Sequence, residues 1–243
     1  MKKVLFLISI AVIVGMFAAM AYAATPEELF KVADDVYKKK DVAAVKANMK
    51  DLEGLAASNE AAAWRFGRAS YFVGARTDDA KTQEGIFSKG YKALEPYFNK
   101  GTKDVNTNYW FALNAGKYGK IKGVLKSLFL VKPMKTACNN VVAKDPGYEE
   151  GGAYTILGAL EYEVPGGDLK KGIDYFNKAL KYNADGIAVN LYLGKSYYKQ
   201  KEYAKAKERL EFIIANGKPE TKDDKKDMAE AKELLAKVIK DMK

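Results

Sequence analysis

The chain has 243 residues, of which 41 are Lys or Arg and 31 are Asp or Glu, so its formal net charge is +10. It contains no histidine. Nucleophile systems that need a His base are therefore excluded, and the commonest ligand of catalytic zinc is missing. Cys138 is the only cysteine, which excludes an internal disulfide, and we expect its thiol to be a small buried apolar group. These absences favour a non-enzymatic protein without a cofactor or a metal.

The first 23 residues have the order of a secretory signal peptide. Lys2 and Lys3 precede an apolar run over 4–20, and 21–23 supply the small-x-small pattern of a cleavage site. We predict an exported, periplasmic chain that begins at residue 24. We expect it to be soluble, because no cysteine near the cleavage site could carry a lipid. The apolar run is about 17 residues long, at the lower limit for a membrane span, so an uncleaved anchor is the alternative.

After this leader, apolar residues recur at three- and four-residue spacing, and short breaks containing Gly, Pro, Asn or Asp separate the segments. No segment alternates apolar and polar residues, so we predict an all-α fold with helices of about 12 to 18 residues. The length and the lack of a linker predict a single domain over 24–243. The expected elements, in chain order, are helices at 26–39 and 42–56, helices that begin near 64 and near 110, a turn at 116–120, an extra helix at 121–131, helical repeats at about 151–186 and 187–219, and a charged capping helix at 221–242.

The two last repeats share a pattern of small and large residues. Gly194 lies on the first helix of one repeat and Leu210 on its second helix, and Gly158 and Phe176 have the same relation in the repeat before it. The small residues let two helix backbones approach, and the large ones fill the space beside them. This pattern resembles the tetratricopeptide repeat, in which two antiparallel helices alternate. The resemblance implies a helical-hairpin solenoid, an α/α superhelix with a concave face.

A narrower resemblance covers residues 55–215. The segment 109–119, Tyr-Trp-Phe-Ala-Leu-Asn-Ala-Gly-Lys-Tyr-Gly, follows a helix that ends at Leu94, and Pro-Gly-Gly-Asp at 165–168 introduces Lys171 and Gly172. This arrangement resembles the T component associated with TRAP-type (tripartite) periplasmic transporters. The resemblance implies a periplasmic partner protein, in particular a solute-binding protein that carries small organic ligands, and a homo-oligomer. The alternative hypothesis is a structural scaffold for envelope or secretion-complex assembly.

We expect the first helix of each pair to line the concave face and to bind a partner protein and a small organic anion. Aromatic rings beside cationic and amide groups suit a carboxylate or an acidic peptide. Nucleic acid is not an expected partner, because the chain is predicted to be exported. The expected binding residues are Arg65, Phe72, Asn108, Phe111, Asn114, Lys117, Tyr118, Tyr162, Lys195, Tyr198 and Lys199.

Charge and hydropathy are uneven around the extra helix. Residues 105–144 contain seven lysines and no acidic residue, whereas 145–168 contain six acidic residues and no basic one. Either neighbouring helices complement one another, or the basic block attracts an anionic partner. Within 121–131 one helical face is apolar, and we expect it to pack in the core. The alternative is an exposed face for oligomerisation or for contact with a membrane surface. This face consists of Ile121, Val124, Leu125, Leu128 and Phe129.

Overall fold

A computed structural model describes residues 25–243, apart from the side chains of Val124 and Lys126. The predicted signal peptide lies outside these residues. The described part of the chain contains eleven α-helices and no strand, and none of these helices is long and apolar enough to cross a bilayer. The helices are α1 (Pro26–Lys38), α2 (Val42–Ala56), α3 (Glu60–Gly74), α4 (Ala80–Asn99), α5 (Val105–Lys122), α6 (Val124–Lys144), α7 (Tyr148–Glu163), α8 (Leu169–Ala179), α9 (Ile187–Lys199), α10 (Tyr203–Asn216) and α11 (Lys222–Asp241).

Polar caps explain where many of these helices begin. Thr25 forms a capping box with Glu28 at the start of α1, and Thr221 does the same at the start of α11. Such side chains satisfy backbone N–H groups that have no partner within the helix. Asp or Asn caps α2, α3, α4, α5 and α8 in the same way. The helices predicted at 26–39 and 42–56 are confirmed to within one residue.

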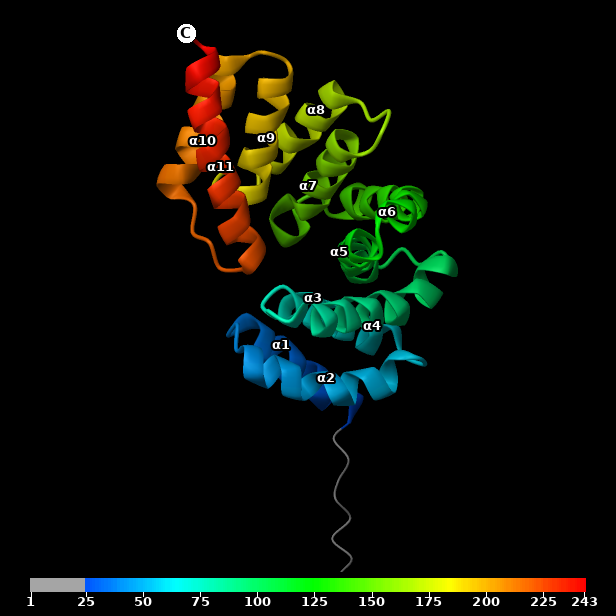
Figure 1. The fold of residues 1–243 in the computed structure, drawn as a ribbon. Helices are drawn as coiled ribbons and strands as arrows, with labels where there is room; N and C mark the ends of the chain where they lie inside the picture. The colour runs from blue at the N-terminus through cyan, green and yellow to red at the C-terminus, as the bar shows by residue number, and fades with distance from the viewer. Residues whose placement is uncertain (1–24) are drawn as a thin grey trace, which may run out of the picture.

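Helices that follow one another in the chain pack as hairpins, and the odd-numbered helices also contact one another. Thus α1 contacts α3, α3 contacts α5, α5 contacts α7, α7 contacts α9, and α9 contacts α11. The odd-numbered helices therefore form one continuous wall, which we call the inner wall, and the even-numbered helices lie behind it. Figure 1 shows α1–α4 at one end, α5 and α6 in the middle and α7–α11 at the other end. The predicted all-α, tetratricopeptide-like superhelix is confirmed.

Small residues mark the close approaches within the hairpins, as the repeat pattern predicts. A Cβ added at Gly158 would lie 2.6 Å from Cδ1 of Phe176, and one added at Gly194 would lie 2.7 Å from Cδ2 of Leu210. Phe176 and Leu210 are completely buried. The hairpins α7–α8 and α9–α10 are thus joined through glycine on one helix and a large apolar side chain on the other.

The boundary between α5 and α6 differs from the prediction. The turn expected at 116–120 is wrong, because α5 continues to Lys122. Gly119 is buried, and an added Cβ there would lie 3.1 Å from the backbone of Ser127, so this glycine serves the approach of α6. The chain turns at Gly123 instead, whose φ of 96° is unfavourable for other residues. The helix expected at 121–131 is also too short, since α6 runs from Val124 through Pro133 to Lys144.

The last helix does more than cover the end of the solenoid. The expected charged cap at 221–242 is α11, which packs on α9 and α10 and buries Ala231 and Val238. In Figure 1 the first turn of α11 points back towards α3 and α5. Glu220, just before α11, accepts hydrogen bonds from Lys40 at 2.7 Å and from Arg76 at 3.4 Å. The C-terminal segment therefore connects the two ends of the superhelix.

Candidate functional site

Four of the expected binding residues are buried and do not reach the surface of the inner wall. Phe72 is 6% exposed and Phe111 is 1% exposed, and the ring of Phe111 stacks on Phe98 with 4.1 Å between centroids. Asn108 and Asn114 are completely buried. These side chains hold the helices together and are not presented to a partner.

The two buried amides act as clamps between segments of the backbone. Nδ2 of Asn108 donates to the carbonyl oxygens of Thr102, at 3.1 Å, and of Asp104, at 2.8 Å. Nδ2 of Asn114 donates to the carbonyl of Gly67 at 2.9 Å, which links α5 to α3. The sequence position of an asparagine does not distinguish such a clamp from a ligand-binding amide.

Arg65 belongs to an ion-pair cluster between α1 and α3. Its guanidinium contacts both carboxylate oxygens of Asp34, with Nη2 at 2.8 Å from Oδ2, and it lies 4.0 Å from the centroid of the Trp64 ring. Arg68 contacts the same carboxylate at 2.6 Å. Burial by itself raises the pKa of Asp34, but the hydrogen bonds from the two arginines outweigh it and lower the pKa below its ordinary value. The cluster joins two helices and leaves little of Arg65 for a ligand.

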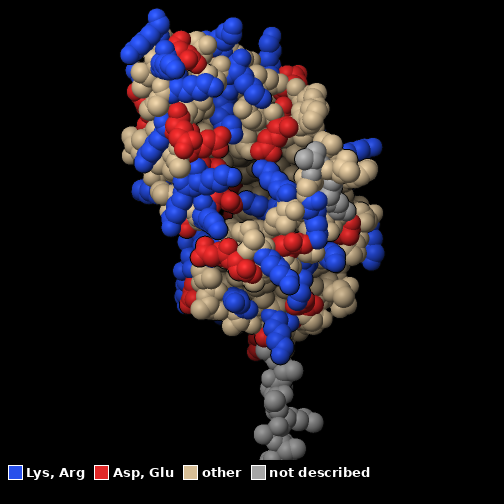
Figure 2. Space-filling view, in the orientation of Figure 1, with Lys and Arg blue, Asp and Glu red and all other residues tan. Residues whose placement is uncertain are grey.

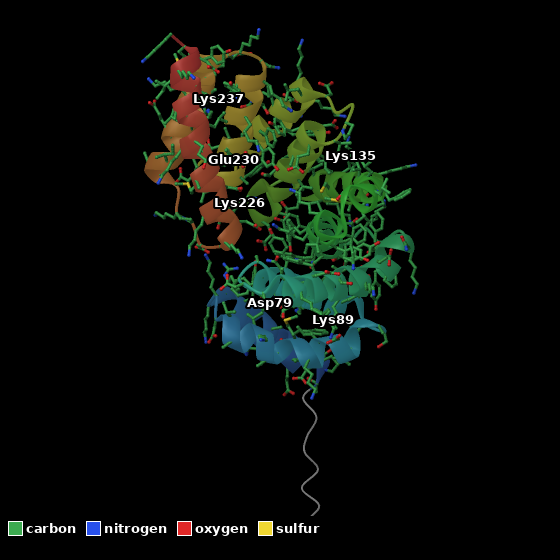
Figure 3. The ribbon with its side chains drawn as sticks, viewed as in Figure 1. Asp79, Lys89, Lys135, Lys226, Glu230 and Lys237 are labelled. Atoms are coloured by element: carbon green, nitrogen blue, oxygen red, sulfur yellow. The ribbon has the colours of Figure 1, made fainter. Side chains whose placement is uncertain are left out.

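The expected binding residues at the C-terminal end face α11. Lys195 forms an ion pair with Glu230 of α11 at 2.6 Å, and the hydroxyl of Tyr198 donates to Asp241 at 2.6 Å. Glu230 is labelled on α11 in Figure 3. Lys199 is exposed, with Nζ 3.9 Å from the centroid of the Tyr162 ring. A helix of the chain itself, through acidic residues that pair with Lys195 and Tyr198, therefore covers part of this end of the inner wall.

Lys117 and Tyr118 connect the inner wall to its neighbours near the middle of the chain. Lys117 forms an ion pair with Asp223 at the start of α11, and the ring of Tyr118 stacks on Tyr91 with 5.1 Å between centroids. Burial acts to lower the pKa of Lys117, but the nearby Tyr71 and Asp223 raise it above its ordinary value. Lys117 is thus held in its charged form, with its nearest acidic group supplied by α11.

An open pocket of about 440 Å³ lies between α5, α6 and α7. Its lining is mostly apolar and includes Leu113, Met134, Ile156 and Leu160. The charged residues of the lining are Lys117, Lys120 and Glu163, and Nζ of Lys120 lies 3.1 Å from a carboxylate oxygen of Glu163. The volume is within the range of pockets that hold small organic molecules. Of the expected binding residues, only Lys117 lines this pocket. The repeat pattern predicts which helices form the inner wall, but it does not predict a space between them and α6.

The apolar face at the start of α6 is exposed next to this pocket. Leu125 and Phe129 are each 76% exposed, and Leu128 is 40% exposed. The expectation that this face packs in the core is therefore wrong for these residues. Only the other side of the helix, with Leu130 and Met134, is buried.

The basic and acidic sequence blocks complement each other across helices. Besides the pair of Lys120 with Glu163, Lys135 of α6 contacts Glu161 of α7 at 2.7 Å. Acidic and basic residues are accordingly interspersed over the face shown in Figure 2. Burial raises the pKa of Glu161, but the hydrogen bonds from Lys135 and from the Asp168 backbone outweigh it and lower the pKa. This carboxylate is a structural ion-pair partner and is not poised to transfer protons.

Within residues 25–243, no group of acidic residues or cysteine could hold a metal ion. Cys138 is completely buried, and burial raises the pKa of its thiol well above the ordinary value. A thiol that stays protonated and cannot be reached by a substrate is a poor nucleophile. The arrangement offers surfaces and a pocket for binding.

Comparison with known proteins places the chain in a family. No curated protein sequence matches it significantly. The family described as "regulator of microtubule dynamics protein 1-3" matches residues 29–240, which is most of the chain and all eleven helices in whole or in part. The match provides nothing on the T component of TRAP-type transporters. The chain, a protein-binding, tetratricopeptide-like helical protein, belongs to the regulator of microtubule dynamics protein 1-3 family.

Proposed function

We propose that this chain is a non-catalytic binding protein and that the pocket between α5, α6 and α7 receives an apolar group of a partner protein. The observation that carries the proposal is the open pocket of about 440 Å³ with its apolar lining. An apolar side chain that enters such a pocket leaves water, and buried anchors of this kind dominate the binding energy of many interfaces. The helical-repeat fold also favours protein binding, because solenoids of this kind present extended surfaces for it.

A small organic anion is the second candidate ligand, and the lysines of the pocket favour it. Lys117 and Lys120 both line the pocket beside the apolar residues. Each lysine already contacts an acidic residue of the chain, Asp223 and Glu163 respectively. A carboxylate ligand would therefore exchange with these groups, so we expect modest affinity that weakens with salt.

Filling the pocket tests both candidates. Ala159 lines the pocket and is half-buried, so Ala159→Phe places a ring in the open space, whereas Ala159→Ser is a control of similar size. The probe is 1-anilinonaphthalene-8-sulfonate, an aromatic anion whose fluorescence rises in apolar surroundings. We expect its affinity to fall about tenfold, the equivalent of 1.4 kcal/mol, in Ala159→Phe and to stay within about twofold of the original in Ala159→Ser. Equal affinity of all three proteins would contradict a binding role for the pocket.

The proposed compartment is the periplasm, and the proposed partner is a solute-binding protein. The leader at 1–23 supports export to the periplasm, and the resemblance to the T component supports a solute-binding protein of an uptake system as the partner. Cell fractionation with N-terminal sequencing tests export, with residue 24 as the expected first residue. Affinity capture from the periplasm with the original protein and with Ala159→Phe tests the partner, which we expect to be lost with the variant.

The scaffold hypothesis predicts a different phenotype. A scaffold for envelope or secretion-complex assembly needs no ligand in the pocket, so Ala159→Phe should leave its function intact. Deletion of the gene would then impair the envelope without a defect in solute uptake. An uptake defect with an intact envelope would instead favour the binding protein.

A further inference from the structure

The outer face of α6 changes from apolar to polar along its length. Five of its exposed residues share one face at helical spacing, with Leu125, Leu128 and Phe129 first, then Lys132, and then Thr136. The end of α5 adds Ile121, which is 37% exposed. We call the four residues Ile121, Leu125, Leu128 and Phe129 the α6 apolar patch. It is confined to the α5–α6 corner, and a lysine follows it one turn later on the same face.

Exposed lysines surround the patch. Lys120 and Lys122 lie on either side of Ile121 at the end of α5, and Lys132 follows Phe129 on α6. Two acidic residues lie close, since Lys120 contacts Glu163 and Lys122 contacts Glu84. Lys132 is exposed and forms no ion pair within the part of the chain that the structure describes. The α5 and α6 helices themselves contain no acidic residue at all.

We propose that the α6 apolar patch docks the protein on an anionic lipid surface, with Leu125 and Phe129 inserted among the acyl chains and the lysines at the headgroups. Apolar side chains flanked by lysines are the arrangement of helices that lie in a membrane interface. Lysine carries its charge on a long flexible stem, so its ammonium reaches the headgroups while the stem stays on the apolar side. Anionic lipids attract such lysines within a Debye length of the surface.

The area of the α6 apolar patch favours a lipid surface over a second copy of the chain as its partner. Large apolar side chains offer about 150–250 Å² each, so the exposed fractions of the four residues amount to roughly 400 Å². A stable protein interface buries about 800 Å² on each partner. The patch is half of that area, whereas insertion of two side chains into a bilayer needs no such extent. The basic rim also repels a copy of itself.

A residue-specific fluorescence measurement tests the proposal on the full chain. A bimane dye is attached to Leu125→Cys, and Cys138 does not react because it is completely buried. The matched control is Ser58→Cys, which is exposed in the turn before α3. Glu60 beside it accepts from Thr102, just before α5, at 2.6 Å. The control therefore lies near the start of α5, about 27 Å along that helix from the patch.

We expect the dye at 125 to shift to shorter wavelength with vesicles of phosphatidylglycerol and phosphatidylcholine. The shift should be at least about fivefold weaker with phosphatidylcholine alone or in 0.5 M salt, because exposed charges are screened. The dye at 58 should not shift. Since the readout reports the surroundings of one residue, insertion of an apolar segment elsewhere in the chain does not reproduce it.

Three results would overturn the proposal. The first is a dye at 125 that stays in water with anionic vesicles. The second is an equal shift at 125 and 58. The third is protection of the dye at 125 without vesicles together with a dimer in analytical ultracentrifugation, which would assign the patch to a second copy. A Phe129→Ser change in the labelled protein should reduce vesicle affinity about tenfold if the ring inserts.

Discussion

Replacing Gly158 by alanine tests the close approach of α7 and α8 on which the superhelix depends. The added Cβ would lie 2.6 Å from Cδ1 and 2.8 Å from Cζ of Phe176, well inside ordinary van der Waals contact. The ring of Phe176 is completely buried and stacks on Tyr192 with 5.5 Å between centroids, so a shift of the ring would disturb this packing. Overpacking of this kind costs about 1–3 kcal/mol. Alanine offsets up to about 1 kcal/mol of that cost as the better helix former. We therefore expect a net loss of up to about 2 kcal/mol.

Gly85→Ala is the matched control for this prediction. Gly85 lies inside α4, and an added Cβ there meets nothing within 4 Å. We expect this change to increase stability by about 0.5–1 kcal/mol through helix propensity alone. The two variants should thus differ by about 1–3 kcal/mol in opposite directions.

Urea and thermal unfolding followed by circular dichroism measure this difference. For a chain of this size, 1 kcal/mol corresponds to about 2–4 °C in Tm. A Phe176→Leu change should relieve the clash, so the double variant with Gly158→Ala should be more stable than the sum of the single effects. If Gly158→Ala stabilises the protein as much as Gly85→Ala does, the tight glycine contact is not present and the reasoning fails.

Three further changes probe charged side chains, two of them in ion pairs. Asp34→Ala leaves Arg65 and Arg68 without their shared carboxylate and should cost about 1–3 kcal/mol, between the values for exposed and buried pairs, as urea unfolding would show. Burial and the neighbouring acidic groups raise the pKa of Asp227, which means that the folded state favours the protonated carboxyl. The contribution of this group to stability is therefore fully present in acid, and it is lost as the pH rises through the raised pKa. Asp227→Asn should therefore raise Tm at pH 7, with the gain disappearing towards pH 4, and an equal gain at both values would contradict this assignment. Glu220→Ala removes the ion pairs with Lys40 and Arg76 and should change the free energy of unfolding by less than about 1 kcal/mol. Hydrogen exchange at the start of α11 should become faster. Unchanged exchange there would mean that these two ion pairs do not hold the segment.

Much of the fold was predictable because its signals are local. Helical spacing of apolar residues and capping side chains act within a few residues, so α1 and α2 could be placed to within one residue. The pairing of Gly158 with Phe176 was also readable, since the repeat sets which residues of a hairpin meet. Local rules failed at Gly119 and Pro133, where glycine and proline indicate a break. Gly119 instead accommodates the backbone of α6, and α6 continues through Pro133.

The site depended on tertiary structure. Periodicity shows that Leu125 and Phe129 share a face, but only the positions of the neighbouring helices decide whether that face is covered. Equally, the spacing of Asn108 and Asn114 places them on a first helix of a pair without showing that their amides bind backbone carbonyls. The sequence alone was enough for the all-α class, for the positions of α1 and α2, and for the pairing of α7 with α8 and of α9 with α10. Only the packed chain decided that α11 covers part of the inner wall and that the pocket opens between α5, α6 and α7, because both depend on contacts between segments far apart in the sequence.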